Sequence, residues 1–226
     1  MAVLKTKEDI VKHVIKVYFD KLRTTPSLPI QQEFNAVEEA YKEYLRTKDV
    51  DDLRYLFAIC LRIRHGRRMP WVNTREAVDK LIDSNIINNK FKDFEALHAE
   101  VKQVLGGINF AQGPLTVYDT ALNIGYILKV LPKKNIYLYV GAWEGANAIA
   151  QIFKLTIQHV MDVSVWQVPG LFLGIESMYI EDILCVFLDI FKKMPGPIRT
   201  EEIDDTAKFC PFEPFTKEYA LKRMNY

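Results

Sequence analysis

Apolar residues recur at helical spacing along most of the chain, and this pattern is strongest between Phe91 and Leu131. It predicts two helices joined by a tight glycine turn, in the order KFKDFEALHAEVKQVLGG, INFAQ and GPLTVYDTALNIGYILKVL. The second helix is apolar on two neighbouring faces, which are formed by Leu115, Tyr118, Leu122 and Gly125 and by Val117, Ala121, Ile124 and Leu128. A helix of this kind is buried on more than one side, so we expect it to lie at the centre of the fold.

The same spacing predicts further helices at 7–23, 30–46, 51–64, 73–84, 144–153, 177–193 and after Thr216. Thr6 is the expected N-cap of the first of these helices, and either Asp49 or Asp51 that of the third. Asn73 and Glu76 have the spacing of a capping box, so we expect the fourth helix to begin there.

Strand patterns are sparse. The sequence NIYLYV at 135–140 predicts a strand or an extended buried connector, whereas 156–174 mixes β-branched residues with helix breakers and predicts no definite element. We therefore expect a mainly α protein, a single globular multi-helix domain over 1–226 with at most one or two short strands. The alternative is a subdivision into N-terminal helices at 1–70 and a core with a C-terminal tail at 71–226.

Composition narrows the classes of function. Apolar residues make up 49% and charged residues 26% of the chain, as is ordinary for a globular protein. The formal net charge is +1, so attraction to nucleic acid requires a local patch. Three widely spread cysteines and an N-terminus without a signal-peptide pattern predict a reduced, cytoplasmic protein. Acidic residues interrupt the apolar stretch 171–191, so we expect no membrane association.

The connection between the two central helices reads FAQGPLT from Phe110 to Thr116. It resembles the helix-hairpin-helix motif of non-sequence-specific DNA-binding proteins and DNA glycosylases, although Ala111 replaces the first glycine and Gln112 the apolar residue between the glycines. Gly113 and Thr116 fit the motif. The resemblance implies that backbone N–H groups at the start of the second helix hold a DNA phosphate, with Ala111, Gln112, Gly113 and Thr116 at the site. GPLTVYDTALNIG also resembles segments of bacterial proteins without an assigned function.

The resemblance to glycosylases does not extend to their catalytic residues. The family's lysine lies two residues after the second glycine, where this chain has Leu115, and its aspartate would fall near Lys133–Tyr137, where no acid is present. We therefore predict no catalytic residues. The alternative for the whole hairpin is a plain helix connector, in which Gly106 and Gly107 end one helix and Pro114 opens the next.

A second candidate site is a cluster of arginines at the end of the third predicted helix, formed by Arg62, Arg64, Arg67 and Arg68 and followed by Trp71. Arginine holds phosphate with two parallel hydrogen bonds, and tryptophan stacks on bases, so the cluster predicts a contact with nucleic acid. The alternative is structural, because cations also stabilise the C-terminus of a helix.

Metal and cofactor patterns are absent from the sequence. Glu95 and His98 have the spacing of a di-iron helix bundle, but no second copy of that spacing exists and the histidines are scattered. The leading hypothesis is non-catalytic binding of DNA or another nucleic acid. One alternative is a protein-interaction or structural module, suggested by an apolar tail that contains Phe209, Phe212 and Phe215. The other is a divergent glycosylase-like enzyme, for which Asp119 and Glu144 are the first acids to examine.

Overall fold

The computed structural model describes residues 3–24, 29–62, 69–133, 135–160, 163–167, 170–194, 196–206 and 215–226. The chain forms two compact units, each built from two separate stretches of sequence. Unit 1 comprises Met1–Leu28 and Pro132–Cys210, and unit 2 comprises Pro29–Leu131 and Pro211–Tyr226. The units do not divide near residue 70, because helices from both sides of that position pack together in unit 2. A single domain over 1–226 stays a prediction.

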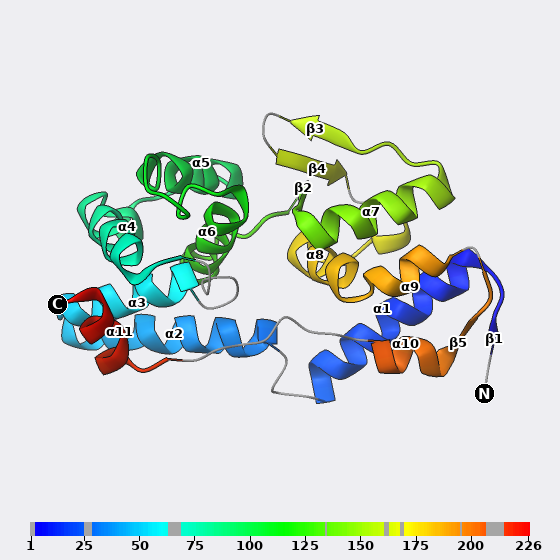
Figure 1. The fold of residues 1–226 in the computed structure, drawn as a ribbon, viewed down its shortest axis with the longest axis horizontal. Coiled ribbons are helices and arrows are strands. Elements are labelled where there is room, and N and C mark those ends of the chain that lie inside the picture. Colours follow the sequence, from blue (N-terminus) through cyan, green and yellow to red (C-terminus); the bar gives the residue numbers. More distant parts are fainter. Residues whose placement is uncertain are drawn as a thin grey trace. The chain divides into compact units, whose positions relative to one another are not determined.

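The mainly helical class is confirmed, with eleven α-helices in the described part of the chain (Figure 1). The strand content was underestimated, because the described residues form five short strands in two sheets. Two of these strands fall within 156–174, where the sequence predicted no definite element, and two others have only two residues each. Strands this short offer too few positions for an alternating pattern to be recognised.

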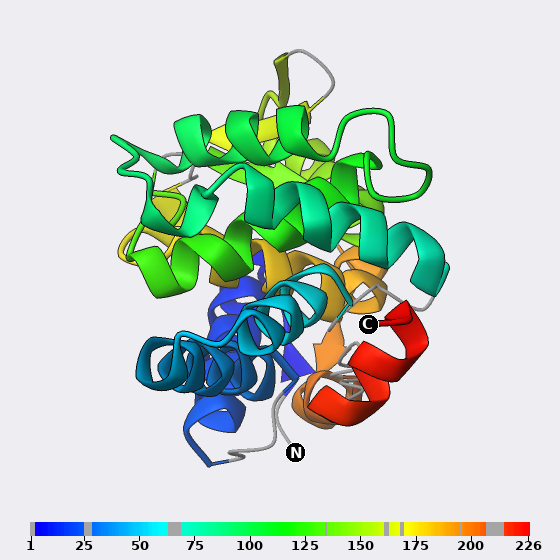
Figure 2. The same cartoon turned by 90° about the vertical axis from the view of Figure 1, so that its left-hand side faces the viewer.

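Unit 2 is wholly helical in its described residues. Its elements are α2 (Pro29–Thr47), α3 (Val50–Arg62), α4 (Trp71–Asp83), the short 3₁₀ helix η2 (Ile86–Asn88), α5 (Phe94–Val104), α6 (Pro114–Leu128) and α11 (Lys217–Met224). Helices α2 and α3 run side by side, and α6 packs against α2, α3 and α5 (Figure 1, Figure 2). Ten residues of α6 are buried, including Val117, Ala121 and Ile124. The expectation of a central, buried helix is therefore confirmed.

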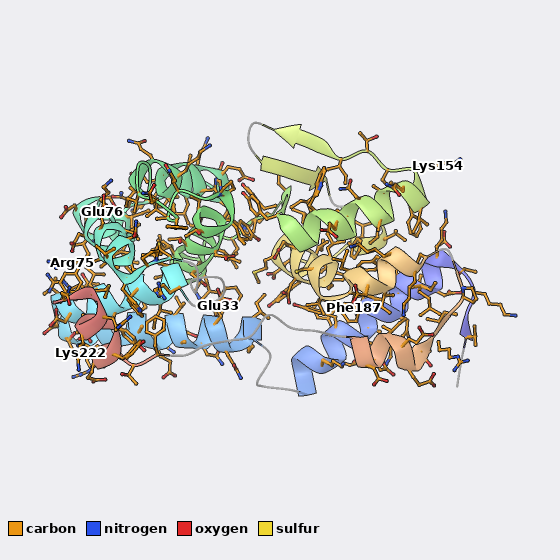
Figure 3. The ribbon with its side chains drawn as sticks, viewed as in Figure 1. Glu33, Arg75, Glu76, Lys154, Phe187 and Lys222 are labelled. Carbon is orange, nitrogen blue, oxygen red and sulfur yellow. The ribbon has the colours of Figure 1, made fainter. Side chains whose placement is uncertain are left out.

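Unit 1 combines helices with both sheets. Its elements are β1 (Val3–Leu4), α1 (Lys7–Thr24), β2 (Asn135–Leu138), α7 (Val140–Phe153), β3 (Gln158–Val160), β4 (Val163–Gln167), the 3₁₀ helix η3 (Gly170–Phe172), α8 (Ser177–Val186), α9 (Leu188–Lys193), β5 (Ile198–Arg199) and α10 (Thr200–Thr206). Strand β1 pairs with β5, and the other sheet has the order β2-β4-β3, with every pairing antiparallel. The buried core includes Ile10, Tyr18 and Phe187, the last of which is labelled in Figure 3.

Three predicted helix starts are confirmed by their hydrogen bonds. The Thr6 hydroxyl accepts a hydrogen bond from the Asp9 N–H at 3.1 Å, and the Thr216 hydroxyl accepts one from the Tyr219 N–H at 3.2 Å. Asp49, rather than Asp51, caps α3, since its carboxylate accepts from the Asp51 N–H at 2.6 Å. Each cap satisfies an N–H group that has no partner within the helix.

The predicted capping box of α4 is wrong. The helix begins at Trp71 with Pro70 as N-cap, and Asn73 lies within its first turn. The Asn73 side chain donates instead to the Asn109 carbonyl at 3.1 Å. A contact with a residue distant in sequence thus replaces the local cap that the spacing suggested.

Two other predicted boundaries are also wrong. The helix predicted at 144–153 begins earlier, at Val140, so Gly141 and Gly145 both lie inside α7. A Cβ atom at 141 would stand 2.8 Å from the Cys185 sulfur, and one at 145 would collide with the Leu184 carbonyl. The two glycines therefore let α7 approach α8 closely. The predicted helix 177–193 is two helices that meet at Phe187.

Candidate nucleic-acid interface

The connection between α5 and α6 is a loop whose apolar side chains are buried in the core. Leu105, Ile108 and Ala111 are fully buried. Hydrogen bonds within the loop join the Ile108 N–H to the Leu105 carbonyl at 3.3 Å and the Gln112 N–H to the Ile108 carbonyl at 3.2 Å. The Gly107 N–H donates to Oε1 of Gln112 at 3.1 Å. The loop therefore has a defined shape.

Helix α6 begins at this loop without a side-chain cap. Gly113 is the N-cap, Pro114 occupies the first helical position as predicted, and the N-cap residue makes no side-chain hydrogen bond to the first turn. The first N–H groups of a helix have no partner within it, and they lie at the positive end of the helix dipole. The N–H groups of Leu115 and Thr116 therefore provide donors suited to an anion.

The structure does not require glycine at position 113. Its φ of −61° and ψ of 139° are accessible to any residue. A Cβ atom there would lie 3.6 Å from the Phe110 carbonyl oxygen and 4.0 Å from Oγ1 of Thr116, which are ordinary contacts. The absence of a side chain instead leaves the backbone at the start of α6 open to close approach.

The four hairpin residues predicted to bind phosphate have different environments. Ala111 is fully buried, so its side chain faces the core. Gln112 is exposed, but its side-chain oxygen accepts from Gly107 and braces the loop. Gly113 and Thr116 are half-buried at the start of α6. Gly113 and Thr116 are thus the two of the four that lie where the uncapped N–H groups begin.

Helix α4 braces the same connection at two points. Nδ2 of Asn73 donates to the Asn109 carbonyl at 3.1 Å, and Nζ of Lys80 donates to the Gly106 carbonyl at 3.3 Å. The first hydrogen bond brings the start of α4, where Trp71 stands, next to the hairpin. Trp71 of the second candidate region therefore lies near the hairpin in unit 2, which the sequence alone did not show.

Arg62 and Trp71 are packed against each other. The Arg62 guanidinium lies 4.0 Å from the centre of the Trp71 ring, and Nη1 donates to the Met69 carbonyl and to Oγ1 of Thr74, the latter at 3.1 Å. Burial lowers the pKa of the Arg62 guanidinium below its usual value. Arg62 therefore has a structural role at the junction of α3 and α4. The predicted residues Arg64, Arg67 and Arg68 lie outside the described residues.

Trp71 is also enclosed by the C-terminal segment. The ring centres of Phe215 and Tyr219 lie 5.6 Å and 5.7 Å from that of Trp71, both in edge-to-face arrangements, and Phe215 also contacts Tyr55. Phe215, which the sequence placed in an apolar tail suited to a partner, therefore packs inside unit 2. Phe209 and Phe212 lie outside the described residues. No local pattern in the sequence indicated this return of the chain to α3 and α4.

The polar residues of α6 satisfy buried neighbours. Nδ2 of Asn123 donates to Oε1 of Glu33 at 2.9 Å and to the Cys60 carbonyl at 3.3 Å, and all three residues are buried (Glu33 is labelled in Figure 3). Oγ1 of Thr120 donates to the Thr116 carbonyl at 2.7 Å. Asp119, which would repel a phosphate at the surface, is only 6% exposed. Asn123 therefore joins α6 to α2 and α3 in the core.

Among the described residues, the candidate metal ligands do not cluster. In the described part of the chain, no three His, Cys, Asp or Glu side chains lie close enough to hold a metal ion. Burial, assisted by the charge of Lys102, lowers the pKa of His98 to about 4. Glu144 forms a surface ion pair with Lys192.

Of the helices described, none combines the length and apolarity needed to cross a membrane.

Comparison with known proteins identifies no relative of this chain. No protein-family model matches the chain, and neither the curated proteins nor the solved structures contain a match to it. A functional conclusion therefore has to rest on the residues at the start of α6 and on the chemistry that they can perform.

Proposed function

We propose that this protein binds nucleic acid without catalysing a reaction on it, and that the start of α6 holds a phosphate of the nucleic-acid backbone. The single observation that carries the proposal is the absence of a side-chain cap at Gly113 on a fifteen-residue helix. Helix starts of this kind bind phosphate through their N–H groups. The open approach at Gly113 supports the same conclusion, because a phosphate has to come within hydrogen-bonding distance of the backbone.

The neighbourhood of the site is compatible with an anion. Asp119, one turn after the start of α6, is buried in the core. Lys80 places a cation at the Gly106 end of the connection. Further positive charge belongs to Arg64, Arg67 and Arg68 in the sequence that follows α3, and we propose that these arginines contact neighbouring phosphates. DNA is the nucleic acid that the resemblance to the helix-hairpin-helix motif favours.

The proposal includes no catalytic step. Leu115 stands where a helix-hairpin-helix glycosylase has its nucleophilic lysine, and an alkyl side chain forms no Schiff base. Glu144, one of the two acids considered for catalysis, lies in unit 1 and pairs with Lys192.

Three substitutions of Gly113 test the proposal. Gly113→Asp and Gly113→Asn each supply an N-cap oxygen that occupies the free N–H groups, and the aspartate also adds a negative charge. Gly113→Ala adds a Cβ atom without an acceptor. Because position 113 has the backbone angles and the space for a side chain, all three variants should fold as the wild type does.

Fluorescence anisotropy with short labelled DNA provides the measurement. The wild type should bind with an affinity that falls steeply as salt is raised. Gly113→Asp should abolish binding, Gly113→Asn should weaken it, and Gly113→Ala should have the smallest effect. Equal affinities for the wild type and Gly113→Asp would overturn the phosphate site, and no binding of any probe would overturn nucleic-acid binding altogether.

A second candidate function is supported by a different observation. Val72 is 73% exposed and Phe110 is 58% exposed, and they flank Asn73 and Asn109, whose hydrogen bond joins α4 to the hairpin. Exposed apolar side chains on adjoining segments are a feature of protein-interaction surfaces. Light scattering of the wild type and of a Val72→Asp/Phe110→Asp variant tests the homomeric form of this function, which predicts self-association that the two aspartates abolish.

A further inference from the structure

Phe110 is an aromatic side chain in an unusual position. Its backbone has a φ of +65°, a conformation that glycine or asparagine adopts more readily than an aromatic residue. Its side chain is 58% exposed, so much of the ring remains outside the core. The fold thus holds a large aromatic residue in a costly conformation with most of its surface facing solvent, and such positions are enriched at functional sites.

The position of Phe110 is fixed relative to the start of α6. Its carbonyl oxygen lies 3.6 Å from where a Cβ atom of Gly113 would be, and Oγ1 of Thr116 lies 4.0 Å from the same point. On the other side, the Asn109 carbonyl is bonded to Asn73 of α4. The backbone of Phe110 therefore lies next to the start of α6, and the residue before it is braced by α4.

We infer that Phe110 stacks on an unpaired base, so that the nucleic acid held by this surface is single-stranded. The inference rests on the proposed function and adds the class of nucleic acid to it. The positive end of α6 is complementary to a backbone phosphate. The exposed side chain of Phe110, three residues before Gly113, is suited to the face of a base. Inside a duplex both faces of each base are covered by neighbouring base pairs. A side chain that stacks on a base consequently selects single strands.

Fluorescence anisotropy and base-stacking fluorescence of the full chain test the inference. The probes are a labelled oligothymidylate of about ten nucleotides, a duplex of the same length, and the oligothymidylate with one 2-aminopurine, whose fluorescence falls on stacking. The variants are Phe110→Ala, Phe110→Leu and Phe110→Trp. Val72→Ala is the matched control, because Val72 is an exposed apolar residue at the start of α4 beside the same hairpin.

The wild type should bind the single strand more tightly than the duplex and should quench 2-aminopurine. Phe110→Ala and Phe110→Leu should each weaken single-strand binding by roughly tenfold and remove the quenching, while Phe110→Trp should retain both. Val72→Ala should change neither. Because the Phe110 ring is largely exposed, these variants should keep the folded structure of the wild type.

Several results would overturn the inference. They are preference for the duplex, unchanged single-strand binding in Phe110→Ala, retention of affinity by Phe110→Leu, or an equal loss in Val72→Ala. If binding remains sensitive to Gly113→Asp in any of these cases, the proposed phosphate site stands and only the stacking role fails. If the wild type binds no probe but self-associates through Phe110, both ideas fail and the surface is a protein interface.

Discussion

Nζ of Lys217 lies 2.5 Å from Oδ1 of Asp52, and this ion pair joins α11 to α3 across 165 residues of sequence. The other carboxylate oxygen of Asp52 accepts from Oγ1 of Thr47 at 2.6 Å. Asp52 is buried, so its charge depends on these two donors. The C-terminal helix, which also borders Trp71, is therefore held in place by a charged group in the interior of unit 2.

The free energy of unfolding should depend on this pair in acid. The hydrogen bond from Lys217, followed by that from Thr47, holds the pKa of Asp52 below its usual value of 3.8. The stabilisation is present above the usual value and is lost as pH falls through the lower pKa of the folded state. Asp52→Asn should lower the free energy of unfolding by about 1–3 kcal/mol at neutral pH and by much less in strong acid.

Urea denaturation of the wild type and Asp52→Asn, from neutral pH to well below the usual pKa of 3.8, provides the measurement. Glu38→Gln is the control, since Glu38 forms a solvent-exposed i,i+4 pair with Lys42 and should contribute little. A deficit in Asp52→Asn that stays the same from neutral pH into strong acid would contradict the proposed dependence on charge.

His98 should produce a second loss of stability at a higher pH. Its pKa is lowered to about 4 from an ordinary value of 6.5, first by burial and then by Lys102. The unfolded chain therefore takes up a proton between these two values that the folded chain does not, and stability falls as pH drops from about 6.5 to 4. His98→Leu should remove this slope. Thermal unfolding of both proteins at intervals between about pH 6.5 and pH 4 would measure this slope. An unchanged slope in the variant would contradict the role of His98.

Tyr226 should contribute strongly to the attachment of the C-terminal segment. The guanidinium groups of Arg54 and Arg75 lie 4.0 Å and 4.9 Å from the centre of its ring, and its hydroxyl donates to Asp79. Tyr226→Phe removes the hydroxyl and should cost about 1 kcal/mol of unfolding free energy, whereas Tyr226→Ala also removes the ring and should cost more. Equal stability of the Phe and Ala variants in urea denaturation would show that the stacked guanidinium groups contribute nothing.

What the sequence predicted well depends on neighbouring residues. The apolar faces of α6 indicated a central helix, and Thr6 and Thr216 lie close to the N–H groups that they cap. What it predicted poorly depends on distant partners. Asn73 is bonded to a residue of the hairpin rather than to its own helix, and Gly145 faces Leu184. Such contacts leave no periodic trace in the sequence.

The candidate site divides in the same way. The position of Pro114 at the start of α6 followed from local sequence preferences, and the structure confirms it. The stacking of Arg62 on Trp71 and the covering of Trp71 by Phe215 required the packing of three separate segments. The exposure of Phe110 likewise depends on the path of the loop, so the sequence pattern gave no reason to select it.

Two glycines at opposite ends of α6 should respond differently to alanine. A Cβ atom at Gly125 would collide with the Val130 carbonyl and lie 3.2 Å from the Leu97 side chain, and the Val130 N–H donates to the Gly125 carbonyl at 2.7 Å. Gly125→Ala therefore has to displace the end of the helix and should cost about 1–3 kcal/mol of unfolding free energy. At Gly113 the added atom meets only ordinary contacts, so Gly113→Ala should change that energy by less than about 0.5 kcal/mol.

Urea denaturation followed by circular dichroism would compare the two variants at one pH. We expect Gly125→Ala to be the less stable of the two variants, because the fold requires glycine at 125 and not at 113. The proposed phosphate site depends on this difference. Because an alanine at 113 introduces no clash, a large destabilisation there would mean that the glycine serves the fold itself. The open backbone at the start of α6 would then no longer support a ligand site.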